Sequence, residues 1–410
     1  MSDFDNVPLA NLADYINGMA FKPDDFTDSG LPVIRIEQLK NRKASFDLYD
    51  KPVAARNRIQ NGDLIFSWSA SLFLQIWDRG PAILNQHLFR VDPKPDVDKL
   101  FLKYRIEESL PDLVNASHGS TMQHITRKEL DKCIVNFPRS KAQQAKIAQV
   151  LATLDRVIAQ TDSLLDKQQR VKAGLMQELL TRGIDADGKM RPSQVSASTP
   201  YSGWQVRRLG DVAEVASGLT LGRVLSGPNL LTLPYLRVFN VQDGYLDLSD
   251  VKTVAIRPNE LSRYCLQKGD VLMNEGGDFD KLGRGAVWEG QIKLCLHQNH
   301  VFRVRTNRKV LLPDFLALIS ASAYGKAFFV LHSKQSTNLA SINSTQLKSF
   351  PIPCPDVEEQ KRLLEVAREQ DIVLASTQNS LRKMRSLKAG LMQDLLTGRV
   401  SVLPLMGESV

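Results

Sequence analysis

Two long segments of the chain carry apolar residues at steps of three and four, the spacing that places side chains along one face of an α-helix. The first spans residues 141–184 and the second spans residues 356–400. Neither contains a proline, and Pro138 and Pro355 stand shortly before them, where helices commonly begin. A helix of about 38 residues is about 57 Å long. Its narrow apolar stripe is typical of a coiled coil, so the pattern predicts two long helices with a helical partner.

The two segments are copies of each other. Residues 172–181 read KAGLMQELLT and residues 388–397 read KAGLMQDLLT, an offset of 388 − 172 = 216 positions. The same offset holds without a gap back to Gln144 and Gln360. Self-similarity of this kind indicates an internal duplication. We therefore expect the two helices to pack on each other, antiparallel and about a pseudo-twofold axis.

One polar residue lies on each stripe near the middle of the helix, Thr161 in the first and Thr377 in the second. A polar residue at such a position can fix the register of a coiled coil. Threonine is also small enough to be tolerated by the packing, so both interpretations stay open.

Each helix follows a region of shorter elements. The strand-like runs VIRI, LIFSW and HLFRV of the first region resemble PYLRV, DVLM and HVFRV of the second. Helix-like runs follow at residues 100–110 and 314–331. The offsets change between runs, so the two regions share a skeleton and differ in their loops. Two regions that read different targets on one common frame would show this pattern.

These patterns predict an α/β (α+β) fold in which two tandem globular domains are separated and joined by the two helices. The predicted order is a first domain at 1–140, a helix at 141–184, a linker rich in Ser and Pro at 185–203, a second domain at 204–355, a helix at 356–400 and a C-terminal tail at 401–410.

A polar loop follows the shorter helix in both regions, at residues 115–123 and 332–341. Both loops contain Ser-Thr at the same place, a few residues before a matching Ile. Side chains of this kind suit contacts with phosphates or base edges. An ordinary solvated loop is the alternative, and the recurrence in both halves favours a functional role.

The composition of the chain indicates which kind of partner it binds. The 410 residues include 53 Lys and Arg against 45 Asp and Glu, a formal net charge of +8, which suits a polyanionic partner. Many soluble proteins are mildly basic without binding nucleic acid, so charge alone does not decide. No apolar run approaches a membrane span, and MSDFDNVPLANL lacks the pattern of a secretory signal. With four scattered cysteines and no CxxC pair, we expect a cytoplasmic protein with free thiols.

Motifs for catalysis are missing from the sequence. It has no GxxxxGK[ST] phosphate-binding loop, no Asn-Pro-Pro-aromatic methyltransferase signature and no convincing nuclease carboxylate pattern. CLHQNH at 295–300 contains residue types that bind metals, but strand alternation puts Cys295 and His297 on one face and His300 on the other. We therefore predict no catalytic residue and no metal site.

The tandem arrangement, the two LPxxR strand starts, the paired Ser-Thr loops and the two helices that end in KAGLMQxLLT resemble the specificity subunits of type I restriction-modification systems. The resemblance covers almost the whole chain. The departure is that Trp204, which opens the second region, has no counterpart in the first.

The resemblance implies that each globular region is a target recognition domain that reads one half of a bipartite, asymmetric site on double-stranded DNA. The helices would act as a spacer between the two half-sites. Two modification (methyltransferase) subunits would dock around the helices and bind S-adenosylmethionine. Restriction subunits would add the ATP- and Mg-dependent nuclease. This chain itself would bind no cofactor.

Candidate contacts follow from the loops and the helix ends. The predicted DNA-binding residues are Trp68, Ser69, Ser71, His118, Ser120, Thr121, Gln123, Asn274, Glu275, Lys281, Arg284, Lys334, Gln335, Thr337 and Asn338. Trp68 could instead belong to the core, the more common place for tryptophan. The predicted partner-binding residues are Lys172, Gly174, Met176, Gln177, Lys388, Gly390, Met392 and Gln393.

Three other interpretations remain at this point. The chain could be a coiled-coil scaffold that does not bind DNA, although this leaves the diverged repeats unexplained. It could be an enzyme, which would need a motif that the sequence lacks. It could also be the recognition subunit of a type IIB-like or other defence complex.

Overall fold

The computed structural model describes residues 4–116, 124–192, 203–227, 229–277, 282–283, 285–335 and 340–407. The chain divides into two compact units, and both long helices pass from one unit to the other. Unit 1 comprises Met1–Leu164 with Gln378–Val410, and unit 2 comprises Leu165–Thr377. Each unit therefore contains one globular region, half of the first long helix and half of the second.

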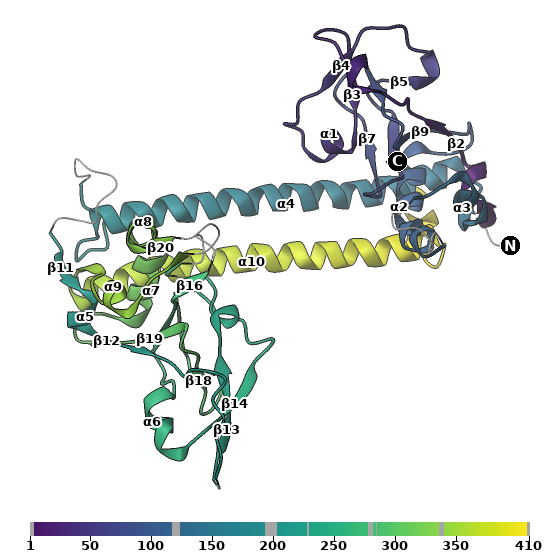
Figure 1. Ribbon diagram of the computed structural model, residues 1–410. Coiled ribbons are helices and arrows are strands. Elements are labelled where there is room, and N and C mark those ends of the chain that lie inside the picture. The colour runs from purple at the N-terminus through teal and green to yellow at the C-terminus, as the bar shows by residue number, and fades with distance from the viewer. Residues whose placement is uncertain are drawn as a thin grey trace. The chain divides into compact units, whose positions relative to one another are not determined.

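The two predicted long helices are present as α4 (Lys141–Arg182) and α10 (Val357–Leu396). Within each unit their segments lie side by side (Figure 1). In unit 1, Lys388 Nζ lies 2.5 Å from Asp155, and Arg385 lies 2.8 Å from Asp162. The partner number falls as the position along α4 rises, so the segments are antiparallel. This confirms the predicted antiparallel packing.

The ion pairs also follow the duplication. Lys172 pairs with Asp371 in unit 2, as Lys388 pairs with Asp155 in unit 1. Lys172 and Lys388 are equivalent at the offset of 216, and so are Asp155 and Asp371. The same inter-helix pair therefore occurs twice with the roles of the two helices exchanged, which agrees with a pseudo-twofold repeat.

Both threonine hydroxyls on the stripes bond within their own helices, and Thr161 Oγ1 also lies 3.8 Å from Sδ of Met384 in α10. Thr161 Oγ1 donates to the carbonyl of Val157 at 2.8 Å, and Thr377 Oγ1 donates to that of Val373 at 3.1 Å. A hydroxyl that bonds four residues back along its own helix needs no polar partner on the other one. This geometry favours tolerance by the packing over a role in register.

The globular region of unit 1 contains one antiparallel sheet, one mixed sheet and a short strand pair. One sheet has the order β2 (Ala13–Asn17), β9 (Leu88–Pro93), β6 (Leu64–Ser67), β7 (Phe73–Ile76). The other has the order β4 (Asp47–Tyr49), β3 (Leu31–Ile34), β8 (Ala82–Leu84), β5 (Arg58–Ile59), in which β3 and β8 are parallel. β1 (Phe4–Pro8) pairs with β10 (Ile134–Pro138) just before α4. The helices are α1 (Ile36–Lys40), α2 (Lys99–Ala116) and α3 (Arg127–Lys132).

Unit 2 repeats this order. β12 (Ala213–Ser217), β19 (Val301–Thr306), β15 (Val271–Asn274) and β17 (Gly285–Val287) form one sheet. β14 (Lys252–Ile256), β13 (Leu231–Leu236) and β18 (Leu296–His297) form another, again with a parallel pair, β13 and β18. β11 (Gln205–Arg208) pairs with β22 (Pro351–Cys354) just before α10. The shared skeleton predicted from the sequence is therefore present in both units.

Unit 2 also contains short elements around this frame. β16 (Gly276–Gly277), β21 (Ala340–Ser341) and β20 (Lys334–Gln335) form a small sheet. The short helices are α5 (Leu209–Val212), α6 (Leu261–Tyr264) and α9 (Ser344–Lys348).

The single helix predicted at 314–331 is two helices, α7 (Pro313–Ala321) and α8 (Ala323–His332), bent by 72°. Ser322 between them is extended, with ψ 164°, and its Oγ accepts the N–H of Gly325 as the cap of α8. Apolar periodicity runs across the break, because both helices bury residues in one core, so the sequence pattern hid the bend. Among the described residues no single helix has the length and apolar character to cross a bilayer, although this bent pair does by those criteria.

The predicted linker and tail are partly folded. Glu359 of α10, whose side chain is 4% exposed, accepts the N–H of Ile184 at 2.9 Å and pairs with the Arg191 guanidinium at 2.5 Å. Residues 184–191 therefore belong to unit 2, which the local composition did not reveal. In the tail, Val402 is 1% exposed in the core of unit 1 and α11 spans Leu403–Met406.

Two equivalent glycines allow a close backbone approach in the two units. A Cβ on Gly18 would stand 2.1 Å from the carbonyl oxygen of Asn85, and one on Gly218 would stand 2.1 Å from that of His297. We expect Gly18→Ala or Gly218→Ala to lower the free energy of unfolding by about 1–3 kcal/mol. Gly174→Ala is the matched control, since nothing lies within 4 Å of its Cβ position. Gly174→Ala should unfold at the same or a higher temperature than the unsubstituted protein, and the prediction is contradicted if Gly18→Ala and Gly218→Ala do so too.

Candidate nucleic-acid interface

In unit 1 an aromatic cluster stands where β6 ends. Trp68 is half-buried, and its ring stacks on Phe89 with centroids 5.4 Å apart. His87 and His124 flank it at 6.0 and 5.6 Å. The indole Nε1 has no hydrogen-bond partner among the described residues. Trp68 therefore packs on the core and also borders the exposed His87, and its role as a DNA contact stays a prediction.

The turn after Trp68 is held in a strained conformation. Ala70 has a φ of 59°, a region that residues with a side chain rarely adopt. The hydroxyl of Ser67 donates to the Ser71 carbonyl at 2.5 Å, and Lys40 Nζ donates to Ser71 Oγ at 2.5 Å. Ser69 is only 3% exposed, so Ser71 and Lys40 are the polar side chains that this turn presents. Lys40 is not among the DNA contacts predicted from the sequence.

Unit 2 places different chemistry at the equivalent position. Glu275 follows β15 as Trp68 follows β6, and its N–H donates to the His300 carbonyl at 3.0 Å. Its carboxylate Oε2 lies 2.6 Å from Nδ1 of His300. The His300 side chain is 57% exposed and the Glu275 side chain 30% exposed. An ionisable pair therefore stands at the surface where unit 1 has an indole ring and two imidazoles.

His87 and His300 are equivalent residues that are not among the predicted DNA contacts. They occupy the same position of the matched runs NQHLFRV and QNHVFRV, immediately before β9 and β19. In both units the histidine contacts the residue that follows the neighbouring strand, Trp68 or Glu275. The imidazole is therefore present in both units, while its neighbour differs. This combination is expected of two domains that bind different targets.

The other predicted DNA contacts differ in exposure, and many lie outside the described residues. Asn274 is 1% exposed and its Nδ2 donates to the Val241 carbonyl at 3.0 Å, so its side chain supports the turn from inside. Lys334 is exposed on β20, beside Gln335, whose backbone pairs with Ala340 of β21. Eight predicted residues lie outside the described residues: His118, Ser120, Thr121, Gln123, Lys281, Arg284, Thr337 and Asn338.

The histidines of the segment 295–300 have different surroundings in the structure. His297 is fully buried and its Nδ1–H donates to the Val301 carbonyl at 2.7 Å, while exposed His300 contacts Glu275. Burial raises the pKa of the Cys295 thiol to about 12. Within the described residues no group of three or more His, Cys, Asp or Glu side chains could hold a metal ion.

The buried imidazole predicts an acid-sensitive unit 2. Burial is the main cause that lowers the pKa of His297 to about 4, below about 6.5 in the unfolded chain. Between these values the unfolded chain binds more protons, so stability falls as the pH drops from about 6.5 to about 4, by about 3 kcal/mol. Denaturant unfolding across this range should show a flatter dependence in His297→Gln than in the control His300→Gln. Equal slopes in the two variants would contradict the assignment.

The predicted partner-binding residues near the helix ends differ in exposure. Gly174, Gln177, Gly390 and Gln393 are exposed, whereas Lys172, Met176, Lys388 and Met392 are half-buried within their units. Nothing lies within 4 Å of the Cβ position of either glycine. Glycine in a helix interior costs about 1 kcal/mol relative to alanine. The packing of the described chain therefore gives no reason for glycine at these two places.

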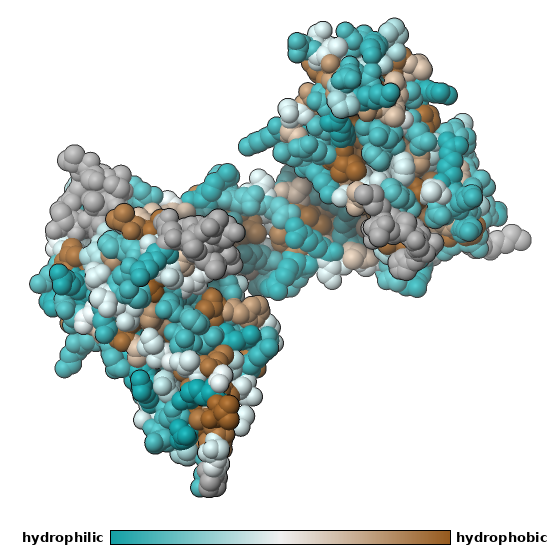
Figure 2. Space-filling model, viewed as in Figure 1, coloured by the Kyte–Doolittle hydropathy of each residue, from teal (hydrophilic) through white to brown (hydrophobic). Residues whose placement is uncertain are grey.

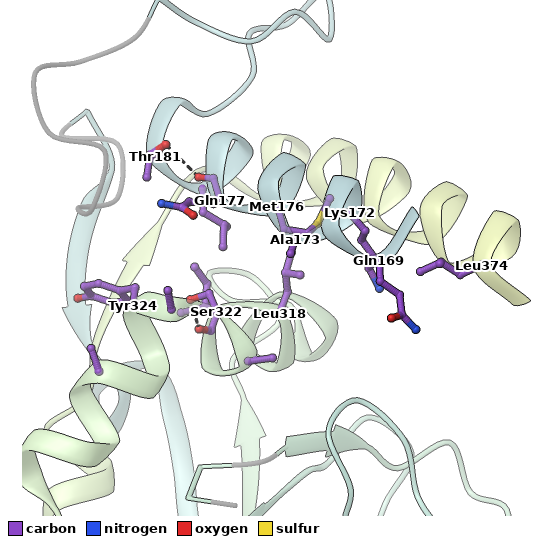
Figure 3. Close-up of a pocket in the computed structure, with 15 residues that line it drawn as sticks. Gln169, Lys172, Ala173, Met176, Gln177, Thr181, Leu318, Ser322, Tyr324 and Leu374 are labelled. Atoms are coloured by element: carbon purple, nitrogen blue, oxygen red, sulfur yellow. Dashed lines mark hydrogen bonds between the residues drawn. The ribbon is translucent and has the colours of Figure 1, made fainter. Parts of the chain in front are cut away.

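In unit 2 a cavity of about 790 Å³ borders the same helix end. Lys172, Met176 and Gln177 of α4 line it from one side (Figure 3). Leu318 of α7, Ser322 between the helices and Tyr324 of α8 line it from the other. At the equivalent place in unit 1 the Tyr104 ring lies under Lys388, 5.4 Å from Nζ. Elsewhere on the face seen in Figure 2, apolar side chains occur in small groups among mostly hydrophilic residues.

Comparison with known proteins identifies one family. The model of the type I restriction modification DNA specificity domain matches residues 1–167 and 201–371. The type I restriction enzyme EcoBI specificity subunit of Escherichia coli is 23% identical over 416 residues, which is 96% of this chain and 86% of that protein. The EcoKI specificity subunit of E. coli strain K12 is 21% identical, over 96% of this chain and 88% of its own. A putative MjaX specificity subunit of Methanocaldococcus jannaschii is 28% identical over 47% of this chain and 45% of its own.

Solved structures share the fold. The S subunit of a type I restriction-modification system from M. genitalium aligns with a TM-score of 0.54 and 15% identity, over 96% of both chains. A chain from a structure on complex assembly and conformational transition of the type I R-M system aligns with a TM-score of 0.61 and 16% identity, over 97% of this chain and 98% of that one.

Proposed function

The chain belongs to the type I restriction-modification DNA specificity family, and we propose that it recognises a bipartite sequence on double-stranded DNA for such a complex. In this proposal unit 1 reads one half-site and unit 2 reads the other. The helices α4 and α10 serve as the spacer that sets the number of unread base pairs between them.

One observation carries the proposal. Two units with the same strand order place Trp68 beside His87 and Glu275 beside His300 at equivalent surface positions. An indole and a carboxylate offer different partners to a base edge, because a carboxylate accepts from the amino group of cytosine while an aromatic ring makes apolar or stacking contacts. The same frame with different chemistry is what two half-sites of different sequence require.

The catalytic work belongs to partner subunits in this proposal. Two modification subunits would transfer methyl groups from S-adenosylmethionine, and restriction subunits would use ATP and Mg²⁺ to translocate and cut DNA. This chain would act in the cytoplasm as a non-catalytic component without a cofactor of its own. The absence of catalytic motifs from its sequence supports this division.

Partner docking would use the exposed ends of the long helices. Gly174 and Gly390 recur at equivalent positions although no neighbour within the described chain restricts them. A partner backbone that approaches closely would explain why both copies lack a side chain there, since small residues permit such an approach. Each unit carries one such surface, which suits two copies of the same partner.

Methylome sequencing of the host with and without this gene tests the proposal. We expect one bipartite motif, two specific parts around a fixed gap, to lose N6-methyladenine when the gene is removed. A DNA-binding titration in rising salt accompanies it, because a protein that neutralises phosphates loses affinity as salt increases. An unchanged methylome together with no salt-sensitive DNA binding would reject the proposal in favour of a scaffold.

A further inference from the structure

One buried side chain recurs at the joint between each globular region and its long helix. Gln144 lies in the first turn of α4 and Gln360 in the first turn of α10, and both are 0% exposed. They are equivalent positions of the duplication. A glutamine amide buried from water needs internal partners for both its oxygen and its nitrogen.

In unit 1 the Gln144 side chain bonds to three backbone groups. Its Oε1 accepts the N–H of Asp98 at 2.7 Å, and its Nε2 donates to the carbonyl of Asp96 at 3.2 Å. Nε2 also donates to the carbonyl of Pro138 at 2.9 Å, at the junction between β10 and α4. Asp98 in turn accepts the N–H of Phe101 and so caps the start of α2.

Unit 2 repeats the arrangement with different neighbouring side chains. Gln360 Oε1 accepts the N–H of Leu312 at 2.8 Å, and Leu312 occupies the N-cap position of α7. Its Nε2 donates to the carbonyl of Val310 at 2.7 Å and to that of Pro355 at 2.9 Å. All three bonds go to backbone atoms, so the joint has been kept while the neighbouring residues changed.

The other contacts between each globular region and its long helix are mostly apolar, and they depend less on direction. Apolar residues such as Ile147 and Leu151 in unit 1 and Leu363 in unit 2 join the cores to the long helices. Apolar burial depends on area and tolerates small rotations, whereas a hydrogen bond weakens steeply when its angle changes. The bond from Tyr104 to Asp155 occurs in unit 1 only, because Leu318 stands at the corresponding place in α7. Among the described residues, the glutamine is therefore the buried polar side chain that makes equivalent hydrogen bonds in both joints.

We propose that Gln144 and Gln360 are positioning residues that fix the angle between each recognition region and its spacer helix, and so determine which gap between half-sites is accepted. The proposal rests on the proposed function, since it concerns how the two readers are held for one DNA site. Each added base pair moves a half-site by about 3.4 Å and turns it by about 35°. A rigid joint rejects such a displaced half-site, and a loosened joint accepts it.

The test uses the methyltransferase complex assembled with its modification subunits. Duplexes carry both native half-sites with the native gap or with a gap changed by one or two base pairs. We expect the unsubstituted complex to methylate the native gap only. Gln144→Met and Gln360→Met keep the side-chain volume but remove the amide, and each should lower the preference for the native gap at least tenfold. Preference for the half-site bases should stay unchanged, a separation that a general loss of structure would not produce.

Controls make each outcome decisive. Gln149→Met alters an exposed glutamine of the same helix and should keep the native gap preference. Gln144→Glu keeps an acceptor for Asp98 but loses both donated bonds, and it should relax the gap as the Met variant does. Unchanged gap preference in the Gln144→Met complex would overturn the inference, whether or not the Gln144→Glu variant folds. An unsubstituted complex without any bipartite target would instead overturn the proposed function, and the inference with it.

Discussion

Glu275→Ala should relax one base pair in one half of the DNA target and leave the other half intact. Glu275 is the acidic side chain that unit 2 presents beside His300, and an acid near phosphates is unfavourable unless it accepts a hydrogen bond from a base. A specific contact of this kind is worth about 1–3 kcal/mol of discrimination. We therefore expect methylation of the native target to fall by roughly 5- to 150-fold, with related sequences gaining relative to it.

The direction in which the affinity for DNA changes distinguishes two roles of Glu275, base reading and simple repulsion of phosphates. If Glu275 only repelled DNA, its removal would raise affinity for all sequences, because one negative charge would be lost from the binding face. Glu289→Ala is the matched control, since Glu289 is exposed in the same unit and pairs with Lys268 at 3.2 Å. Trp68→Ala should relax the opposite half-site. A Glu275→Ala complex that methylates the original motif with undiminished selectivity would exclude Glu275 as a reader.

The elements that the sequence predicted correctly are those that local periodicity determines. The stripes of α4 and α10 continue for many turns, and the repeat of KAGLMQxLLT identified the partner of each helix without any structural information. The strand order could be anticipated only in outline, because pairing joins segments far apart in the chain. The duplication compensated for this in part, since a run that recurs in both halves is supported twice.

The features that the sequence missed depend on single long-range contacts or local backbone angles. The break at Ser322 lies inside an apolar period, and only its extended backbone reveals it. Arg191 stands in a stretch with the composition of a linker, but its guanidinium pairs with Glu359, 168 residues away. Asn274 looked like a base reader, whereas its amide is turned inward to the Val241 carbonyl.

A side chain added at Gly174 or Gly390 should remove one docked partner each. Both positions are exposed, and nothing within 4 Å restricts a Cβ there, so Gly→Leu should leave the chain folded and even favour the helix. If a modification subunit packs its backbone on these glycines, the leucine would prevent close contact. We expect each single variant to bind one modification subunit and the double variant to bind none, while thermal unfolding of the isolated chain is unchanged or shifted to higher temperature.

Light scattering of the assembled complexes measures the number of bound subunits directly. Gly→Ala at the same two positions should cause a smaller loss, because a methyl group displaces a partner less than a leucine side chain does. Ala145→Leu, the same small-to-large change at an exposed position near the start of α4, is the matched control and should keep two subunits bound. A double Gly→Leu variant that still binds two modification subunits would place the docking surface elsewhere. In that case another role for the repeated glycines would be needed. Close packing of α4 against α10 does not supply one, because nothing lies within 4 Å of a Cβ at either position.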